Sequence, residues 1–192
     1  MDGDLDMKIG VLALQGDFAK HEEMLKSLGC DTVQVRTPAD LAICEALVIP
    51  GGESTALFRQ IEFIDLRAPL IEFSHHKNIF GTCAGLILMS SIINGSSQKP
   101  LGILDISIER NAFGRQLDSF KTRLILQLES EVSFEAFLIR APEITAHGST
   151  VEVLSEFEGK PVLIRQGKHL GACFHPELTP DEAVHRYFLN MI

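Results

Sequence analysis

Short apolar runs alternate with helix-like segments along the first half of the chain. Residues 8–14 (KIGVLAL) form a compact run of strand formers, typical of a strand buried on both faces in a parallel sheet. After Asp17, which we expect to cap a helix, apolar residues recur at helical spacing until Gly29. Further strands are expected at 31–36, 46–49 and 78–81, and further helices after Thr55, over 65–76 and over 84–92. This order predicts an α/β fold with three layers, in which helices flank an open, mostly parallel sheet.

The pattern changes after Gly95, where short strands separated by turn residues replace the helices. The expected strands are 101–109, 120–128, 134–140, 151–157, 161–166 and 169–174. Several of them alternate apolar and polar positions, so we expect additional antiparallel strands in the C-terminal half. A closing helix is expected to open at Thr179, with Glu182 completing a capping box. Because no linker or repeat interrupts the chain, we expect one domain over 8–192 behind a flexible extension, 1–7.

Composition and charge narrow the classes of function. The chain has 192 residues and a formal net charge of -9, which argues against a nucleic-acid or anionic-membrane partner. Its longest apolar stretch, 79–93, is too short and too often interrupted to span a bilayer. The acidic first residues are not a secretory signal, so a cytoplasmic location is expected. The four cysteines include no Cys-x-x-Cys pair, and nothing in the sequence calls for a metal or another cofactor.

The strongest chemical signal is the stretch 81–85 (GTCAG), which places Cys83 between two glycines. Gly-x-Cys-x-Gly is the cysteine form of the nucleophile elbow, a tight strand-to-helix turn that lifts its nucleophile out of the sheet. A thiol at a helix N-terminus is also favoured as thiolate by the helix dipole. The alternative is that Cys83 is a small core residue beside two turn glycines.

A second signal follows the last expected strand, in Phe174-His175-Pro176-Glu177. A cysteine nucleophile needs a base to take its proton, and the base needs an acceptor to orient it. In an extended segment His175 and Glu177 point the same way, so the two side chains are expected to hydrogen-bond. An isolated His-x-Glu is otherwise a surface pair. Together with the elbow it predicts a Cys83–His175–Glu177 triad.

A third signal is the turn Pro50-Gly51-Gly52 after a buried strand. Glycines let backbone N–H groups approach a ligand closely, so Gly51 and Gly52 are candidates for an oxyanion hole together with the Ala84 N–H. The alternative is a plain turn before a helix. The turn is not a Walker loop, because no Lys-Ser/Thr follows it.

The three signals together resemble the class I (triad) glutamine amidotransferases, which have a flavodoxin-like fold. Within that class the chain is similar to the glutaminase-subunit family of pyridoxal 5′-phosphate synthases over residues 8–192. The motifs that carry the narrower resemblance are Leu14-Gln15-Gly16, Gly51 to Thr55 (GGEST), residues 109–116 (ERNAFGRQ) with 118–120 (DSF), 139–142 (IRAP) and 174–179 (FHPELT). Ala56 departs from the family, which often has a second threonine there.

The resemblance implies a function, a substrate and a partner. It implies hydrolysis of L-glutamine to L-glutamate and ammonia through a γ-glutamyl thioester, in a hetero-oligomer with a synthase subunit that uses the ammonia to make pyridoxal 5′-phosphate. The implied glutamine-binding residues are Gly52, Glu53, Ser54, Arg110, Ile139 and Arg140. It also implies that the free glutaminase is poorly active, with Gln15 sensing docking of the partner. For Arg110 and Arg140 the alternative is a structural ion pair.

Two rival functions remain open. One is a glutaminase subunit for another amidotransferase, in the histidine or purine pathway, against which the 109–116 block argues. The other is a non-catalytic regulator with an elbow cysteine, against which the His175–Glu177 pair argues. The remaining histidines are expected to be unimportant: His21 on the exposed face of the first helix, and His185 without a partner.

Overall fold

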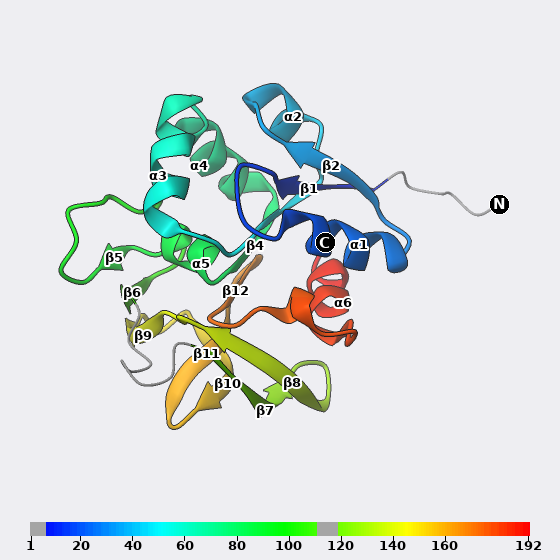
Figure 1. Cartoon of the computed structure of the whole chain (residues 1–192), viewed down its shortest axis with the longest axis vertical. Helices are drawn as coiled ribbons and strands as arrows, with labels where there is room; N and C mark the ends of the chain where they lie inside the picture. Colours follow the sequence, from blue (N-terminus) through cyan, green and yellow to red (C-terminus); the bar gives the residue numbers. More distant parts are fainter. Residues whose placement is uncertain (1–6, 111–118) are drawn as a thin grey trace.

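A seven-stranded sheet runs through the centre of the molecule in the strand order β10-β11-β12-β4-β3-β1-β2 (Figure 1). The computed structural model describes residues 7–110 and 119–192. Five neighbouring strands are parallel: β2 (Asp31–Val35), β1 (Lys8–Leu12), β3 (Ala46–Ile49), β4 (Asn78–Thr82) and β12 (His169–Ala172). The edge strands β11 (Lys160–Gln166) and β10 (Glu152–Phe157) continue the sheet in antiparallel fashion. Every residue of β3 and β4 is buried, which explains the wholly apolar sequence of β3 (ALVI) and the apolar centre of β4 (NIFGT).

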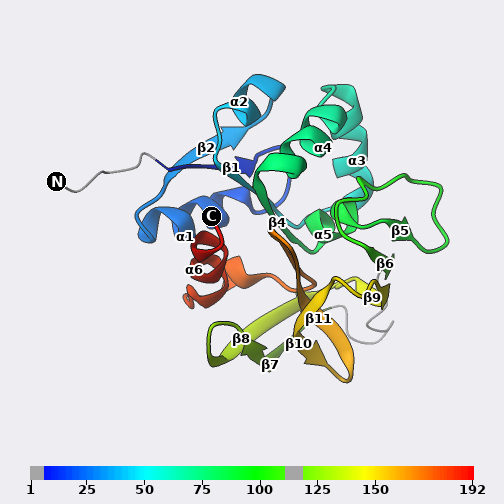
Figure 2. The same ribbon diagram turned by 180° about the vertical axis from the view of Figure 1, so that it is seen from behind.

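Helices cover both faces of this sheet and make the fold three-layered. Figures 1 and 2 place α1 (Phe18–Ser27) and α6 (Ala183–Asn190) together on one side of the parallel strands. The other side carries α3 (Ser54–Phe63), α4 (Arg67–His76) and the short α5 (Ala84–Met89). Because β3, β4 and β12 run parallel, their carboxyl ends meet at one edge of the sheet, where side chains can gather.

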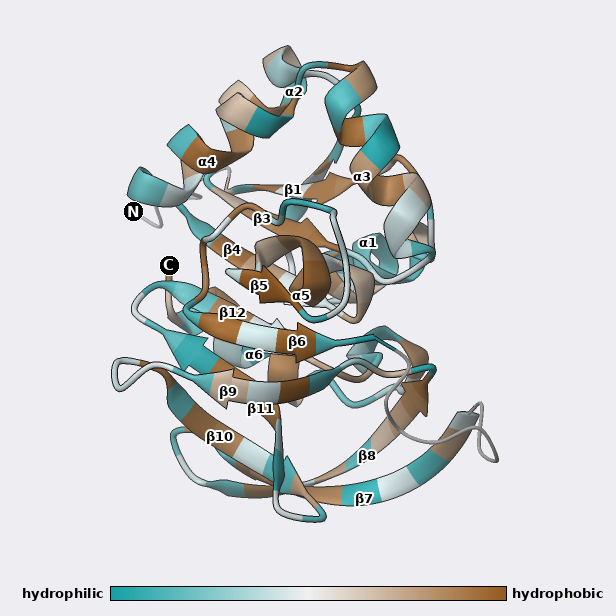
Figure 3. Cartoon of the chain, turned by 90° about the vertical axis from the view of Figure 1, so that its left-hand side faces the viewer, coloured by the Kyte–Doolittle hydropathy of each residue, from teal (hydrophilic) through white to brown (hydrophobic). Residues whose placement is uncertain are grey.

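Two smaller groups of strands lie beyond these carboxyl ends, and most of their pairings are antiparallel. A three-stranded sheet contains β5 (Ile92–Ile93), β6 (Ile106–Glu109) and β9 (Glu143–His147), and a separate hairpin joins β7 (Ser119–Gln127) to β8 (Glu131–Ile139). In Figure 3 the hairpin forms a curved flap below the main sheet, with apolar residues alternating along it. The hairpin contacts the start of the 3-10 turn η1 (Pro176–Leu178). There the N–H of His175, the residue before η1, donates to the Phe137 carbonyl of β8 at 3.0 Å.

The predicted α/β class is confirmed, and so are the additional antiparallel strands. Several elements differ from expectation. The five-residue helix α2 (Pro38–Ala42) was missed, although Thr37 and Asp40 form a capping box around it. The strands β5 and β9 were also missed. The helix expected over 84–92 ends at Met89, and the strand expected over 101–109 begins only at Ile106.

The closing helix was predicted with the wrong cap. It begins at Ala183, so Thr179 and Glu182 form no capping box. The Thr179 hydroxyl instead accepts from the Asp181 N–H at 3.2 Å, and the Asp181 carboxylate accepts from the Ala183 N–H at 2.9 Å. Asp17, expected as a cap of the first helix, precedes α1 but makes no side-chain capping bond. Gly29 does follow the α1 C-cap, with φ at +84°. Of the expected extension 1–7, residues 1–6 lie outside the described residues.

Candidate active site

Cys83 occupies the turn between β4 and α5, as predicted for a nucleophile elbow. Its backbone has φ 47° and ψ −103°, a conformation that a non-glycine residue adopts only when its surroundings enforce it. The Cys83 N–H donates to the Ala172 carbonyl of β12 at 2.9 Å, which ties the turn to the neighbouring strand. The thiol therefore stands at the carboxyl edge of the sheet on a fixed backbone.

The two glycines of the elbow are required by close packing. A Cβ on Gly85 would lie 2.1 Å from the Ile49 carbonyl oxygen of β3, and one on Gly81 would lie 2.5 Å from the Met89 sulfur. Neither separation is compatible with a carbon atom. The elbow thus packs backbone against backbone, and this contact brings the end of β3 next to Cys83.

Replacing Gly85 by alanine is expected to destabilise the fold by about 3 kcal/mol or more, because the Ile49 backbone must move to admit a methyl group. Gly29→Ala is the matched control. It also changes a glycine beside a helix, at φ +84°, but no atom lies within 4 Å of its added carbon, so a loss of about 1–2 kcal/mol is expected. Urea unfolding measures both. Equal losses would contradict the close approach at the elbow.

His175 follows β12 and hydrogen-bonds to Glu177 behind it. Its Nδ1 lies 2.8 Å from Glu177 Oε1, and the carboxylate is buried. The sequence argument assumed an extended segment here. In the structure Pro176–Leu178 instead forms a 3-10 turn. The turn still directs both side chains to one another, so the predicted pair forms by a different backbone route.

Electrostatics favour a charged imidazole at this position. Burial opposes a charge on His175, but its interactions with the Cys83 sulfur and the Glu177 carboxylate outweigh that cost and raise the pKa of His175 to about 10. Burial likewise opposes the Glu177 charge, whereas His21 and His175 lower the pKa of Glu177 to about 2. The arrangement thus favours an imidazolium next to the Cys83 sulfur, which is where a cysteine nucleophile needs a proton-carrying partner.

The loop after β3 faces Cys83 and His175 across a narrow gap. A Cβ on Gly51 would lie 2.4 Å from His175 Cε1 and 3.3 Å from Cys83 Cβ, so only glycine fits there. The next residue, Gly52, has φ 141°, and a Cβ added to it would lie 2.2 Å from the Gln15 side-chain oxygen. That oxygen accepts from the Glu53 N–H at 2.8 Å. Gln15 therefore holds the Gly51–Gly52 turn in its present conformation.

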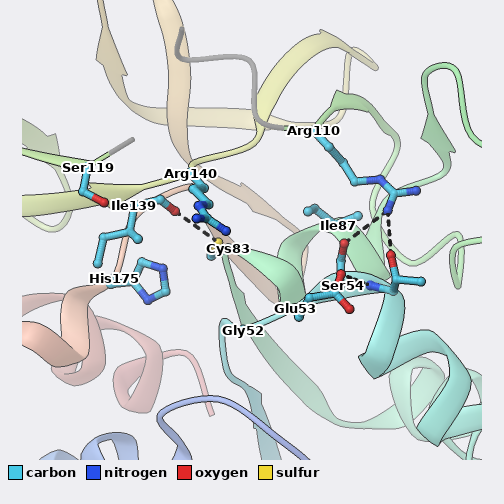
Figure 4. A pocket seen from close by; sticks show the side chains of 11 residues that line it. Gly52, Glu53, Ser54, Cys83, Ile87, Arg110, Ser119, Ile139, Arg140 and His175 are labelled. Atoms are coloured by element: carbon cyan, nitrogen blue, oxygen red, sulfur yellow. Dashed lines mark hydrogen bonds between the residues drawn. The ribbon is translucent and has the colours of Figure 1, made fainter. Parts of the chain in front are cut away.

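A cavity of about 570 Å³ opens beside the thiol (Figure 4). Its walls come from the turn after β3, the elbow at Cys83, the residue after β6, the β7–β8 hairpin and His175. The lining residues are Gly52, Glu53, Ser54, Thr55, Cys83, Ile87, Arg110, Ser119, Ile139, Arg140 and His175. Figure 4 shows the Ile139 carbonyl directed at the Cys83 sulfur, which lies 3.9 Å from that oxygen.

Charged groups stand at the far wall of the cavity from His175. The Glu53 carboxylate accepts from the Thr55 and Ala56 N–H groups and so caps α3. Burial opposes its charge, but these two hydrogen bonds lower the pKa of Glu53. Arg110 donates to the Ser96 hydroxyl at 2.6 Å and to the Ser54 hydroxyl at 3.3 Å. The cavity thus combines a thiol at one end with both signs of charge at the other.

The profile of the SNO glutamine amidotransferase family matches residues 11–192. The chain belongs to this family. A relative from Pelotomaculum thermopropionicum, named pyridoxal 5′-phosphate synthase subunit PdxT, is 50% identical over 185 residues, covering 96% of this chain and 94% of its own. A relative of the same name from Thermotoga maritima is 44% identical over 187 residues, covering 97% of this chain and all of its own.

Solved structures agree with the family assignment. The structure described as a glutamine amidotransferase superimposes with a TM-score of 0.90 at 44% identity, covering 95% of this chain and 97% of its own. A structure of PurLQS from Thermotoga maritima matches with a TM-score of 0.67 at 16% identity, covering 97% and 99% of the two chains, and so shares the fold alone.

In this SNO-family chain the candidate residues predicted from sequence lie together. Cys83 and His175 line the cavity with Gly52, Glu53, Ser54, Arg110, Ile139 and Arg140, and Glu177 lies behind His175. Gly51 and Ala84 flank the thiol. Residues 111–118, which hold most of the family's Glu-Arg-Asn block, lie outside the described residues. Thr55, Ile87 and Ser119 also line the cavity and were not singled out.

The expectation for His21 was wrong. It was placed on the exposed face of the first helix, but its side chain is fully buried and its Nε2 lies 3.3 Å from Glu177 Oε2. His185, expected to have no partner, lies 2.9 Å from His21 Nδ1. The sequence held a signal for this, because His21 falls on the same helical stripe as Phe18 and Leu25.

Within 7–110 and 119–192, no helix is long and apolar enough to cross a membrane. In the same ranges, no cluster of three or more histidine, cysteine or acidic side chains is placed to hold a metal ion.

Proposed function

We propose that this protein is the glutaminase subunit of a pyridoxal 5′-phosphate synthase, with residues 8–192 acting as one glutaminase domain. It hydrolyses L-glutamine to L-glutamate and ammonia, and the ammonia passes to a synthase subunit. The observation that carries the proposal is the meeting of Cys83 and His175 in one cavity with Glu177 behind the imidazole. The relatives at 44–50% identity, which are named subunits of that synthase, support the choice of pathway.

The first chemical step forms a bond between the Cys83 sulfur and the glutamine side-chain carbonyl carbon. The thiolate attacks while the neighbouring imidazolium of His175 retains the proton. Negative charge moves to the carbonyl oxygen, where backbone N–H groups at Ala84 and around Gly51–Gly52 stabilise it. The Ala84 N–H suits this role, because the first N–H groups of a helix have no acceptor within the helix.

The second step breaks the carbon–nitrogen bond of the tetrahedral intermediate. His175 donates its proton to the departing nitrogen, which leaves as ammonia, and the γ-glutamyl thioester remains on Cys83. The neutral imidazole then takes a proton from water as the water attacks the thioester. Glutamate leaves, and the thiolate–imidazolium pair is restored with atoms and charge in balance.

Binding of glutamine requires partners for its two charged ends. The Arg110 guanidinium is suited to the α-carboxylate, since a planar fork of donors matches a carboxylate. The low pKa of Glu53 keeps a negative charge near the α-amino group. Ser54 and the Ile139–Arg140 segment complete the walls around the chain of the substrate.

Replacing Arg110 by alanine is expected to raise the KM for glutamine about 10- to 100-fold, because a charged hydrogen-bond partner of the substrate is lost. The measurement is glutamate production in the assembled complex at varied glutamine. Arg186→Ala is the control, since this exposed arginine pairs with Glu182 on α6, away from the cavity. A large loss of thermal stability in the Arg110 variant, with an unchanged KM, would favour the structural ion-pair reading instead.

The Gln15 contact supports a link between docking and activity. The Gln15 side-chain oxygen accepts from the Glu53 N–H, and the Gln15 side chain packs against Gly52. Any movement of the β1–α1 turn would therefore displace the residues of the proposed oxyanion hole. The Gln15 amide nitrogen is buried and makes no hydrogen bond within the described part of the chain. A partner that rearranges this turn would therefore change the stabilisation of the oxyanion, and we propose that the free subunit is poorly active for this reason.

The experiment that tests the function is ammonia release from glutamine, with the protein alone and with added synthase subunits. The pyridoxal-type synthase is expected to raise the rate, and synthase subunits of the histidine and purine pathways are expected to leave it unchanged. Stimulation by one of those subunits instead would move the protein to another pathway. No release with any subunit would support a non-catalytic regulator.

A further inference from the structure

Two histidines that take no part in the chemistry above are buried directly behind Glu177. His21 comes from α1 and His185 from α6, the two helices that cover one face of the sheet. Neither side chain has exposed surface. His21 Nε2 lies 3.3 Å from Glu177 Oε2, and His21 Nδ1 lies 2.9 Å from His185 Nε2. A continuous row of polar groups thus runs from the thiol through the base and the acid to two further imidazoles.

The two oxygens of Glu177 face different imidazoles. Oε1 is 2.8 Å from His175 Nδ1, whereas Oε2 has no hydrogen bond of good geometry and faces His21 Nε2. Thr82 Oγ1 lies 3.4 Å from the same nitrogen. A buried carboxylate oxygen that no donor faces would be costly, because each oxygen can accept more than one hydrogen bond. His21 is therefore placed to satisfy the side of Glu177 that His175 does not reach.

The charge states of this row follow from its burial. The low pKa of Glu177 keeps the group an acceptor at neutral pH. Burial lowers the pKa of His21, and burial together with His21 lowers the pKa of His185 to about 3. Each of these imidazoles is thus neutral and carries one N–H. Asp17 and His175 also act on His21, with opposite signs.

The tautomers can be assigned from the hydrogen-bond network. Because a carboxylate accepts only, the His21 proton sits on Nε2, and its Nδ1 is then an acceptor. His185 must therefore donate from Nε2. Its own Nδ1 is left unprotonated, which agrees with its burial without a hydrogen-bond partner among the described residues. His185 fixes the tautomer of His21 in which the protonated nitrogen is Nε2, the atom that lies 3.3 Å from Glu177 Oε2.

We propose that His21 is a positioning residue of the triad, which holds Glu177 charged and oriented toward His175, and that His185 sets the tautomer in which His21 does so. The proposal rests on the proposed function, since it acts through Cys83, His175 and Glu177. A purely structural pair of buried histidines would affect stability without changing the chemistry of the folded protein.

Paired variants separate these roles. His21→Leu removes the donor at similar bulk, whereas His21→Gln retains an N–H that can reach the carboxylate. In the complex with the pyridoxal-type synthase, His21→Leu is expected to lower kcat for glutamate production about 10- to 100-fold, with KM changed less than about twofold. The acid limb of its pH profile is expected to move to higher pH, because Glu177 without this donor protonates more readily. His21→Gln is expected to recover most of the loss.

His185→Leu and His185→Gln repeat the test one step further from the reaction. The leucine variant is expected to lower kcat with the same shift of the acid limb, and the glutamine variant to be close to wild type. His169→Leu is the control, a buried histidine at the start of β12 that touches neither Glu177 nor His21. Nitrogen NMR of the wild-type protein provides a readout independent of folding of the variants. It is expected to show both His21 and His185 neutral, with the proton on Nε2.

The outcomes distinguish this inference from the function on which it rests. If the wild-type complex produces no glutamate, the proposed function fails and the role of His21 fails with it. If the wild type is active and His21→Leu folds with unchanged kcat and pH profile, only the positioning role is overturned. Should the leucine variants not fold, an Nδ1–H tautomer or a charged His21 in the NMR spectrum of the wild type would overturn it.

Discussion

Replacing Cys83 by alanine is expected to reduce glutamate production in the assembled complex by at least about 10⁴-fold while the fold stays intact. The size of the effect follows from the role of the sulfur. Without it no thioester forms, and His175 alone has no nucleophile to activate. The change removes a single atom from a nearly buried side chain, so the free energy of unfolding is expected to change little.

Cys30→Ala is the matched control for this variant. Cys30 is a half-buried free thiol on the turn before β2, away from the cavity. We expect its variant to retain wild-type activity, measured as glutamate released at saturating glutamine. Retained hydrolysis in Cys83→Ala would remove the elbow cysteine from the mechanism.

The second large effect is expected from His175→Gln, with a loss of kcat of at least about 10³-fold. Glutamine keeps polar atoms in place but cannot carry the proton from the thiol to the leaving nitrogen. The substitution also removes the cation next to the Cys83 sulfur, since the pKa of His175 is raised to about 10. Alkylation of Cys83 by iodoacetamide at neutral pH is therefore expected to slow in this variant, when followed by mass spectrometry of the Cys83 peptide.

The control for the base is His147→Gln, at an exposed position on β9. It is expected to leave both the kcat and the alkylation rate of Cys83 unchanged. A normal alkylation rate in His175→Gln would show that the imidazole does not activate the thiol. A normal kcat would exclude His175 as the base.

Local patterns were sufficient to predict the elbow and the His175–Glu177 pair, because each lies in a short segment whose residue types determine its own backbone geometry. Gly81 and Gly85 are visible in sequence since only glycine fits against Met89 and the Ile49 carbonyl. The pairing of His175 with Glu177 was also local. The spacing of residues along the sequence does not by itself predict that Cys83 and His175 lie close together. Their proximity depends on β4 and β12 being neighbours in the sheet.

The buried histidines show the limit of hydrophobic periodicity. A polar residue on a helix is assigned to solvent by default, yet His21 replaces an apolar side chain on the inner stripe of α1 because it has a partner there. That partner, His185, is 164 positions away, on a helix at the other end of the chain. Only the packing of α1 and α6 on the same face reveals that the two belong together and reach Glu177.

The most direct test of the central claim is to trap the nucleophile with a glutamine analogue that carries a chloroketone in place of the amide. The complex with the pyridoxal-type synthase is treated with the analogue, and the modified peptide is found by mass spectrometry. We predict a single adduct on Cys83, formed faster in the complex than in the free subunit and suppressed by excess glutamine. An adduct on Cys30, Cys44 or Cys173 instead, or an unmodified Cys83 in a complex that turns over glutamine, would contradict the assignment.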